Sequence, residues 1–268
     1  YSDFRIKLAY LSGDVSVKQG VMGIIVADYA KQYKFSGSFT AEGDKVAWVE
    51  GRGCDNASAT LLPTSEIDTS SFSYVMKNGL VTFNISAIDS GRIFSICYGF
   101  ANEPLLQFPS MRAGVHHLHS VESSYSAIDA IVADAAKDFY FIGEGVVPSD
   151  RVRWVNGTND ADCNDGSLKI AEAITEKVIE FDYVATSAVS IPARFAGGPF
   201  ATCFKFGDEP FKLYSDLMLE VLAVSGIITD VGSSSVLVEN DPKIFHIEGA
   251  GVTKGDRVKL IPLEASTS

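Results

Sequence analysis

Hydrophobic and polar residues alternate along much of this chain, in short runs separated by turn-forming residues. Such alternation puts every second side chain on one face and is typical of half-buried β-strands. It predicts strands near residues 2–10, 21–27, 35–37, 45–49, 72–76, 80–85 and 93–100, with turns of Gly, Pro, Asn and Asp between them. The segment Lys77-Asn-Gly79 resembles a hairpin turn between two of these strands. The pattern therefore indicates an all-β chain.

One segment allows two interpretations. Residues 168–184 are rich in Ala and Glu and fit an amphipathic helix. The alignment anchored on Cys203 instead places residues 178–191 over the predicted strands at 72–85, and this favours strands.

The pattern occurs three times. Phe139–Trp154 reads FYFIGEGVVPSDRVRW, and related segments span Tyr33–Trp48 and Phe245–Leu260. Asp44, Asp150 and Asp256, the turn aspartates of the three copies, are each 106 residues apart. A fixed period of this length indicates a tandem array of domains, each long enough to bury its own core.

The repeats divide the chain. Residues 1–11 resemble residues 215–223 and are predicted to be the last strand of a preceding repeat. Repeat 1 is placed at 12–121 and repeat 2 at 122–227, while 228–268 begin a third repeat that stops before its first cysteine would appear. Because a partial sandwich cannot bury its apolar face, we expect a continuing native chain or pairing with a neighbour. The junctions near Val121 and Ile227 lack Gly-Ser or Pro tracts, so the repeats should stack directly.

The four cysteines fall two per repeat. The spacing favours the pairs Cys54–Cys97 and Cys163–Cys203, with four buried free thiols as the alternative. Each bridge would stabilise its repeat by about 4 kcal/mol on the chain-entropy estimate. Three Asn-X-Ser/Thr sequons begin at Asn56, Asn84 and Asn156 and are glycosylation candidates. Paired cysteines together with sequons favour an extracellular or cell-surface protein.

Two tryptophans, Trp48 and Trp154, lie at equivalent positions on a middle strand of each repeat. A tryptophan on a middle strand, a late cysteine and about seven short strands per hundred residues describe an immunoglobulin-like β-sandwich. The first cysteine departs from a true immunoglobulin domain because it follows the tryptophan strand instead of preceding it. The bridge should therefore tie the loop after that strand to the penultimate strand.

Three motifs of repeat 2 carry a resemblance to a known group of proteins. The segments 141–145, 150–155 and 203–211 (FIGEG, DRVRWV and CFKFGDEPF) resemble the tandem immunoglobulin-like repeats of large extracellular proteins of protists, including surface adhesins and mastigoneme-like flagellar filaments. The resemblance covers nearly the whole chain and includes no catalytic motif. It implies a role in extracellular architecture or adhesion.

Charge excludes some partners. The net charge of −12 argues against a nucleic-acid backbone, and no apolar run is long enough to cross a bilayer. The first residues read as the middle of a domain without a signal peptide, so we expect an excised or mature piece.

Candidate chemistry has a structural explanation in each case. The pairs Gly143/Gly145 and Gly249/Gly251 lack the third glycine of a phosphate loop and are expected to allow close backbone packing. Trp48 and Trp154 could stack on sugars, but their place on alternating strands predicts core packing.

Metal and enzymatic sites are not expected. The turn aspartates and the acidic run at 159–165 could bind calcium, but no EF-hand pattern is present, and Asp is a common turn former. His116, His117 and His119 form a cluster without an evident third zinc ligand, and a solvated or interface role is expected, with a pH-responsive contact as a hypothesis. No nucleophile–histidine–acid pattern stands out. The prediction is therefore a non-enzyme without metal or cofactor.

Two functions remain open. The first is a structural or adhesive protein in which tandem disulfide-locked sandwiches build a rod or filament, with neighbouring repeats or copies as partners. The second is a ligand- or glycan-binding receptor or adhesin module that uses the loops of Cys54 and Cys163.

Overall fold

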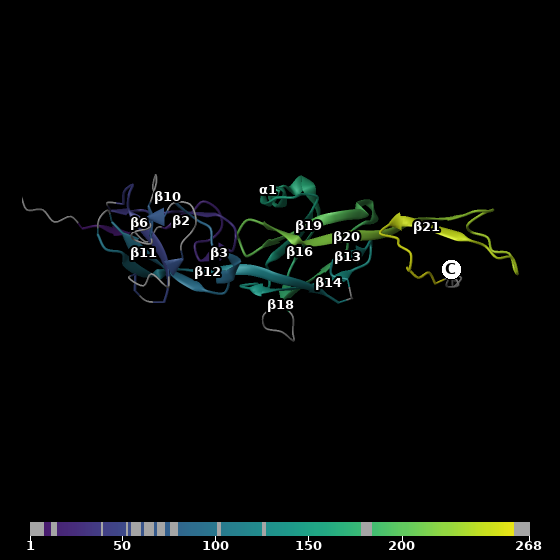
Figure 1. Ribbon diagram of the computed structural model, residues 1–268, viewed down its shortest axis with the longest axis horizontal. Coiled ribbons are helices and arrows are strands. Elements are labelled where there is room, and N and C mark those ends of the chain that lie inside the picture. Colours follow the sequence, from purple (N-terminus) through teal and green to yellow (C-terminus); the bar gives the residue numbers. More distant parts are fainter. Residues whose placement is uncertain are drawn as a thin grey trace, which may run out of the picture.

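A computed structural model describes residues 8–11, 15–38, 40–51, 53–54, 60–61, 67–68, 73–75, 80–100, 103–124, 127–177 and 184–259. The molecule is all-β and elongated, and repeat 1, repeat 2 and the start of the third repeat follow one another along its long axis (Figure 1). The predicted class of tandem immunoglobulin-like β-sandwiches is confirmed.

Short strands form repeat 1. They are β1 (Tyr10–Leu11), β2 (Ser16–Val17), β3 (Ile24–Val26), β4 (Lys31–Lys34), β5 (Gly37–Ser38), β6 (Lys45–Glu50), β7 (Thr60–Leu61), β8 (Ile67–Asp68), β9 (Ser73–Val75), β10 (Leu80–Phe83) and β11 (Ile93–Gly99), with a 3-10 helix η2 (Ala87–Asp89). The long strand β12 (Leu106–Ser123) follows.

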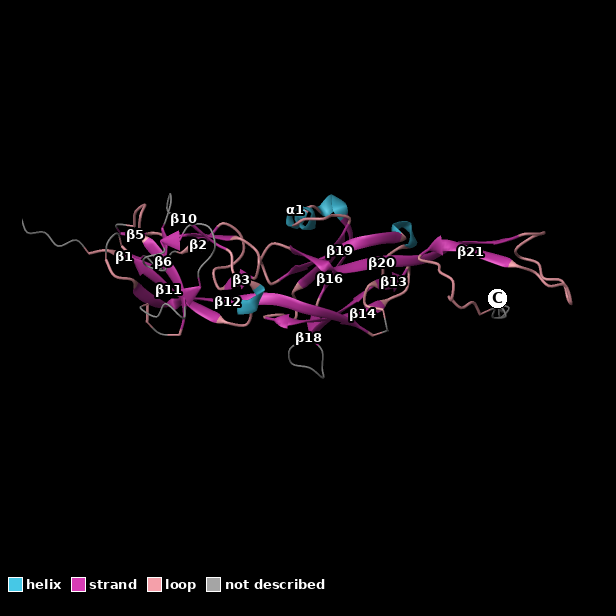
Figure 2. Cartoon of the chain, in the orientation of Figure 1, coloured by secondary structure: helices cyan, strands magenta, loops and turns pink. Residues whose placement is uncertain are grey.

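Repeat 2 has a related order of elements, with two short helices after its tryptophan strand. They are β13 (Ala130–Val132), β14 (Lys137–Glu144), β15 (Arg151–Val155), α1 (Asp160–Asn164), η3 (Gly166–Leu168), β16 (Lys169–Ile174), β17 (Glu176–Lys177), β18 (Val184–Val189), η4 (Ala193–Phe195), β19 (Gly197–Lys205) and β20 (Lys212–Thr229), followed by β21 (Phe245–Ala250). Short helices are confined to connections, as Figure 2 shows. Because β16 and β17 are strands, the helical interpretation of residues 168–177 is wrong.

Each repeat is a sandwich of two sheets. In repeat 1, β10-β4-β2 faces the sheet containing β12-β11-β6-β9-β8. In repeat 2, β17-β18-β14 with the second half of β12 faces β13-β20-β19-β15-β16. The alternating strands turn their apolar residues inward, where Trp48 packs edge-on against Tyr33 and Phe83 at ring distances of 5.2 and 5.0 Å. Trp154 packs against Phe139 at 5.5 Å in the second core.

The hairpin expected across residues 77–79 is not formed by the flanking strands. These three residues lie outside the described part of the chain. β9 pairs with β6 and β8, whereas β10 pairs with β4 in the opposite sheet. β9 and β10 therefore lie in opposite sheets, because the alternating face of β10 buries Val81 and Phe83 in the core of repeat 1.

The expected linkers near Val121 and Ile227 lie inside strands. β12 and β20 each contain 18 residues and run through these positions without interruption. The first half of β12 pairs with β11 of repeat 1, and its second half pairs with β14 of repeat 2. β20 joins β19 to β21 in the same way. Successive repeats thus share a strand.

Candidate functional site: the junction between repeats

The shared strand is the first layer of the junction. Gly114–His116 of β12 pair in parallel with Ile24–Val26 of β3, and β12 then passes to β14. The equivalent pairing of β13 with Glu220–Leu222 of β20 lies 106 residues later. A continuous hydrogen-bonded strand has no freely rotating linker, so it restricts bending between repeats.

The second feature of the junction is a close contact that two glycines of the repeated motif allow. A Cβ added to Gly143 would lie 2.2 Å from the carbonyl oxygen of His117. At Gly145, which has a φ of 74°, an added Cβ would lie 2.3 Å from Nδ1 of His116. Gly249 is equally close to Ala223 of β20, at 1.9 Å. Gly143 and Gly249 therefore allow close packing of backbone, as the sequence predicted, whereas Gly145 makes room for the imidazole ring of His116.

A buried ion pair forms the third layer. Nζ of Lys31 in repeat 1 lies 2.6 Å from Oε1 of Glu209 in repeat 2, and the two side chains are only 4% and 2% exposed. The same ammonium donates to the carbonyl oxygens of Val21 and Ile24 at 2.5 and 2.6 Å. The amide of Val21 donates to Oε1 of Glu209 at 2.8 Å. All three ammonium protons thus have acceptors, as a buried charge requires.

Burial shifts both partners. It lowers the pKa of Lys31 and raises the pKa of Glu209, and the contact between them partly offsets each shift. Removing one partner would leave the other charge buried and uncompensated, which is the costly case for such pairs. The pair therefore fixes how repeat 2 sits on repeat 1.

A second lysine crosses the same junction. Nζ of Lys212 in β20 donates to the carbonyl oxygen of Ala27 and lies 3.9 Å from Oδ2 of Asp28. Asp28 adopts a φ of 55°, and the equivalent residues Asp134 and Asn240 are also left-handed. These turns recur at the 106-residue period, so each repeat presents the same backbone to its successor.

The histidines lie at this junction. The ring of His116 packs on Phe206 of repeat 2 at a centroid distance of 5.4 Å, and His117 and His119 lie 5.1 Å apart. Burial lowers the pKa of both His116 and His117. Across the ranges that the structure describes, no group of three or more His, Cys, Asp or Glu residues could hold a metal ion.

The three turn aspartates close the same turn in each copy. Oδ2 of Asp44, Asp150 and Asp256 accepts the amide three residues earlier, at 2.8 Å each time. Asp150 also accepts the amide of Gly207 at 2.8 Å. These aspartates shape turns at separate places in the chain and do not converge on one site.

Both predicted disulfides are present. Cys54 is bonded to Cys97 and Cys163 to Cys203, which excludes the alternative of free thiols. Each bridge ties the loop after the tryptophan strand to the penultimate strand. Trp48 and Trp154 are fully buried and offer no stacking surface for a sugar.

The sequons are placed in part. Asn84 and Asn156 are exposed, so their side chains are accessible for a glycan. Asn56 lies outside the described residues.

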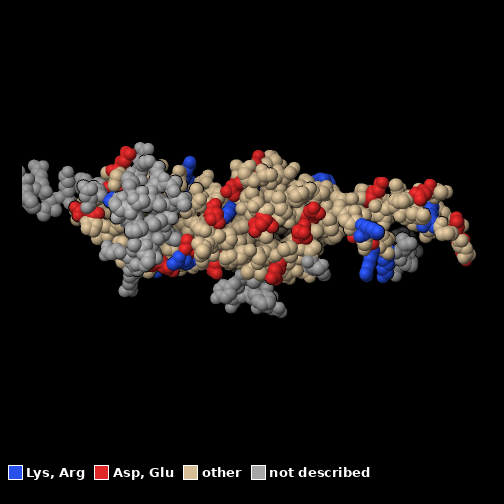
Figure 3. All heavy atoms as spheres, in the orientation of Figure 1, with Lys and Arg blue, Asp and Glu red and all other residues tan. Residues whose placement is uncertain are grey.

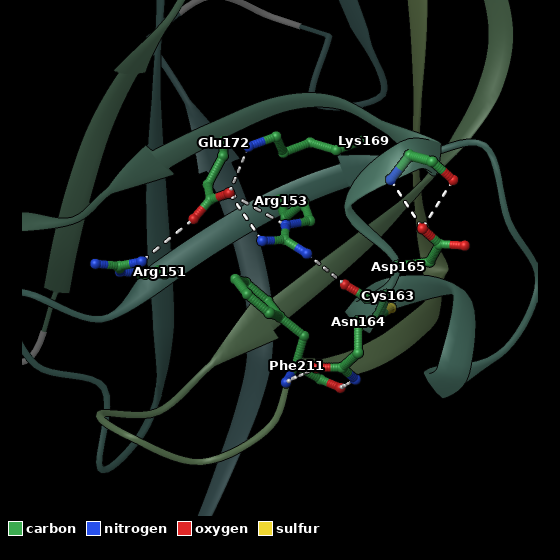
Figure 4. Close-up of polar contacts among 9 residues, drawn as sticks. Arg151, Arg153, Cys163, Asn164, Asp165, Lys169, Glu172 and Phe211 are labelled. Atoms are coloured by element: carbon green, nitrogen blue, oxygen red, sulfur yellow. Dashed lines mark hydrogen bonds and ion pairs between the residues drawn. The ribbon is translucent and has the colours of Figure 1, made fainter.

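The loop of Cys163 is ordered by its own contacts, which Figure 4 shows. Arg153 donates to Glu172 and to the carbonyl oxygen of Cys163, and its guanidinium lies 4.2 Å from the ring centre of Phe211. Asn164 bonds both the amide and the carbonyl of Phe211. The carbonyl group of Cys163 and the side chain of Asn164 are therefore used to hold the loop in place.

Acidic side chains are scattered over the visible face of the molecule and do not form one continuous patch (Figure 3). No helix among the described residues is long and apolar enough to cross a membrane.

Lys31 and Glu209 were not among the residues singled out from the sequence. Lys31, Lys137 and Lys243 recur at the 106-residue period, and Glu103 and Glu209 do so as well. That recurrence was the available signal. It did not show that the lysine of one repeat meets the glutamate of the next.

Comparison with known proteins gives no family. No family model and no curated protein matches the chain. Among solved structures, one similar chain is the glucan utilization protein SGBP-B of Bacteroides ovatus in complex with a mixed-linkage heptasaccharide, at 10% identity and a TM-score of 0.24. That match covers 81% of this chain and 47% of the other, so this chain spans about half of that protein.

Two further matches are immunoglobulin-domain proteins. DIP-gamma IG1+IG2 is 9% identical, with 80% of this chain and 97% of the other covered and a TM-score of 0.23. Drosophila OTK extracellular domains 3–5 are 10% identical, with 82% and 70% covered and a TM-score of 0.23. Scores this low carry no argument about function, which must come from the molecule itself.

Proposed function

We propose that this chain is a structural or adhesive extracellular protein whose tandem disulfide-locked sandwiches build a rod or filament. The observation that carries the proposal is the junction, in which a shared strand and a buried ion pair join one repeat to the next. A binding module on a flexible tether needs neither feature. The proposal assigns the chain no catalytic activity.

Three further observations support an extracellular setting. The two disulfides favour an oxidising compartment, and exposed Asn84 and Asn156 are available for glycosylation. The resemblance of the repeats to protist surface and mastigoneme-like filament proteins fits the same role.

Electron microscopy of the native material tests this function. Rods or filaments with a regular axial repeat are the expected result, because a constant period gives each unit a similar rotation and rise. Dispersed single particles that bind sugar would instead favour the receptor or adhesin function.

Glycosidase treatment followed by mass spectrometry would report whether Asn84 and Asn156 carry glycans.

A further inference from the structure

Repeat 2 has a hollow at the position where repeat 1 receives Glu209. Its volume is about 320 Å³, and Ala127, Ala130, Ala135, Lys137 and Leu222 are among the residues that line it. The positions 106 residues earlier include Val21, Ile24 and Lys31, which contact Glu209 or the amine that binds it. The hollow is therefore the second copy of a glutamate-binding site. In repeat 1 this site is occupied by Glu209.

The lysine of this hollow is held as Lys31 is. Nζ of Lys137 donates to the carbonyl oxygens of Ala127 and Ala130, the counterparts of Val21 and Ile24. Nζ of Lys243 donates in the same way to Ser233 and Val236 in the third copy. An ammonium has three protons to donate, and Lys31 uses the third for Glu209. The lysine ammonium of each copy is thus held by the equivalent pair of backbone carbonyl oxygens.

The glutamate turn that occupies the site beside Lys31 also recurs. The amide of Glu209 donates to the carbonyl oxygen of Phe206 at 2.9 Å, and that of Glu103 donates to Phe100 at 2.8 Å. In both turns the glutamate is followed by proline. Each complete repeat therefore carries a glutamate–proline turn at one end and, at the other, a lysine whose ammonium can bind such a glutamate.

We propose that the hollow beside Lys137 is a docking site for the glutamate–proline turn of a further repeat of the same type. The incoming carboxylate would accept from Nζ of Lys137 and from the amide of Ala127, as Glu209 does from Lys31 and Val21. This inference rests on the proposed function, because it names the contact by which the rod extends. The occupant is defined by its chemistry, a carboxylate on a tight turn within a β-sandwich.

The test extends the chain by one repeat. Residues 260–268 are replaced with a copy of residues 154–227, which supplies a second copy of Glu209 at the required spacing. Amide hydrogen exchange is then followed at Ala127 and, as an internal reference, at Val21. The extended chain should slow exchange of the Ala127 amide at least about tenfold relative to the original chain, and changing the copied glutamate to Gln should abolish the effect.

One position calls for a second background. Glu209 lies over Gly20, where an added Cβ would be 2.3 Å from Oε1. The equivalent residue is Ser126, which lies outside the described residues. The extended chain is therefore also made with Ser126→Gly, and protection of Ala127 in either background supports the proposal.

Two outcomes separate this proposal from the rod itself. If Val21 is protected in a Glu209-dependent manner while Ala127 is unprotected in both backgrounds, the docking site is overturned and the first junction stands. If Val21 shows no dependence on Glu209, the stacking that underlies the proposed function fails as well.

A second measurement does not require the extended chain to fold. It applies if the two added cysteines mispair and prevent folding. The original chain is titrated with a peptide copying residues 205–212 (KFGDEPFK) while the amide resonances of Ala127 and Lys137 are recorded. Shifts that vanish when the peptide's Glu is replaced with Gln support the site. Absence of shifts at millimolar peptide, or equal shifts with both peptides, overturns it.

Discussion

At the scale of single residues, Asp150 has a feature that the sequence does not reveal. Its carboxylate is buried, and burial raises its pKa from 3.8 to about 6 despite hydrogen bonds from the amides of Val147 and Gly207. Asp256 makes the same turn contact in the third copy but is exposed. The same turn thus has two electrostatic environments, according to whether a completed sandwich covers it.

The raised pKa predicts a pH dependence. Because the folded chain holds this proton more tightly than the unfolded chain, the contribution to stability is fully present below pH 3.8 and is lost as pH rises to about 6. The free energy of unfolding should therefore fall across this window, and Asp150→Asn should remove part of that slope. Urea unfolding at several pH values measures it, with Asp256→Asn, at the exposed copy of the same turn, as the matched control. Identical slopes in both variants would contradict the assignment.

Gly143 gives a second prediction at this scale. Gly143→Ala would place a methyl group 2.2 Å from the carbonyl oxygen of His117 and force the shared strand away from β14. We expect a loss of about 1–3 kcal/mol in urea unfolding, as for other overpacked sites. Gly166→Ala is the matched control, since its added Cβ meets nothing within 4 Å, and it should change stability by less than about 0.5 kcal/mol. Equal effects would show that the close approach is unimportant.

At the scale of elements, the junction depends on contacts between distant parts of the chain. Lys31 begins β4, and Glu209 lies in the turn between β19 and β20, 178 residues away. The shared strand brings them together because it carries the chain directly from one sandwich into the next.

The ion pair predicts a large effect from a single substitution. Lys31→Met should destabilise the chain by about 3–5 kcal/mol, because it leaves the Glu209 carboxylate buried without its partner. Adding Glu209→Met should recover much of that loss, and a double-mutant cycle in urea measures the coupling. Lys169→Met, which removes an ion pair whose lysine side chain is 41% exposed, is the control and should cost about 0–1 kcal/mol. A Lys31 effect as small as the control's would refute the role given to the pair.

The alternating pattern and the 106-residue period were sufficient to predict the class of fold, the repeats, both disulfides and the buried tryptophans, because each depends on features within one repeat. Three features were missed for a physical reason. The shared strands β12 and β20 replace the linkers expected near Val121 and Ile227, because strand pairing continues from one sandwich into the next. The assignment of β9 and β10 to opposite sheets depends on which sheet buries Val81 and Phe83. The pairing of Lys31 with Glu209 depends on the angle between sandwiches, which no local pattern encodes.

At the scale of the whole molecule, three layers act together between repeats 1 and 2. The backbone is continuous through β12, Gly143 in β14 and Gly145 just after it allow close contact, and the Lys31–Glu209 ion pair adds a buried polar contact. An 18-residue strand spans roughly 60 Å when fully extended, so each shared strand is long enough to belong to two sandwiches.

The third copy shows what a repeat lacks without its remaining strands. Leu237 and Val238 are 60% and 61% exposed, whereas their counterparts in repeat 1, Ile25 and Val26, are 0% and 2% exposed. β3 and β13 each pair with the last strand of their own repeat. The apolar segment at 236–238 is the edge that such a strand would cover.

The most direct test of the central claim, that a shared strand and a buried ion pair make consecutive repeats one stiff unit, is small-angle X-ray scattering of the chain in solution. The profile should fit a single elongated particle with the arrangement in Figure 1, and Lys31→Met should broaden the distribution of orientations between repeats 1 and 2. A profile that requires a bent or widely varying arrangement in the unmodified chain would contradict the claim.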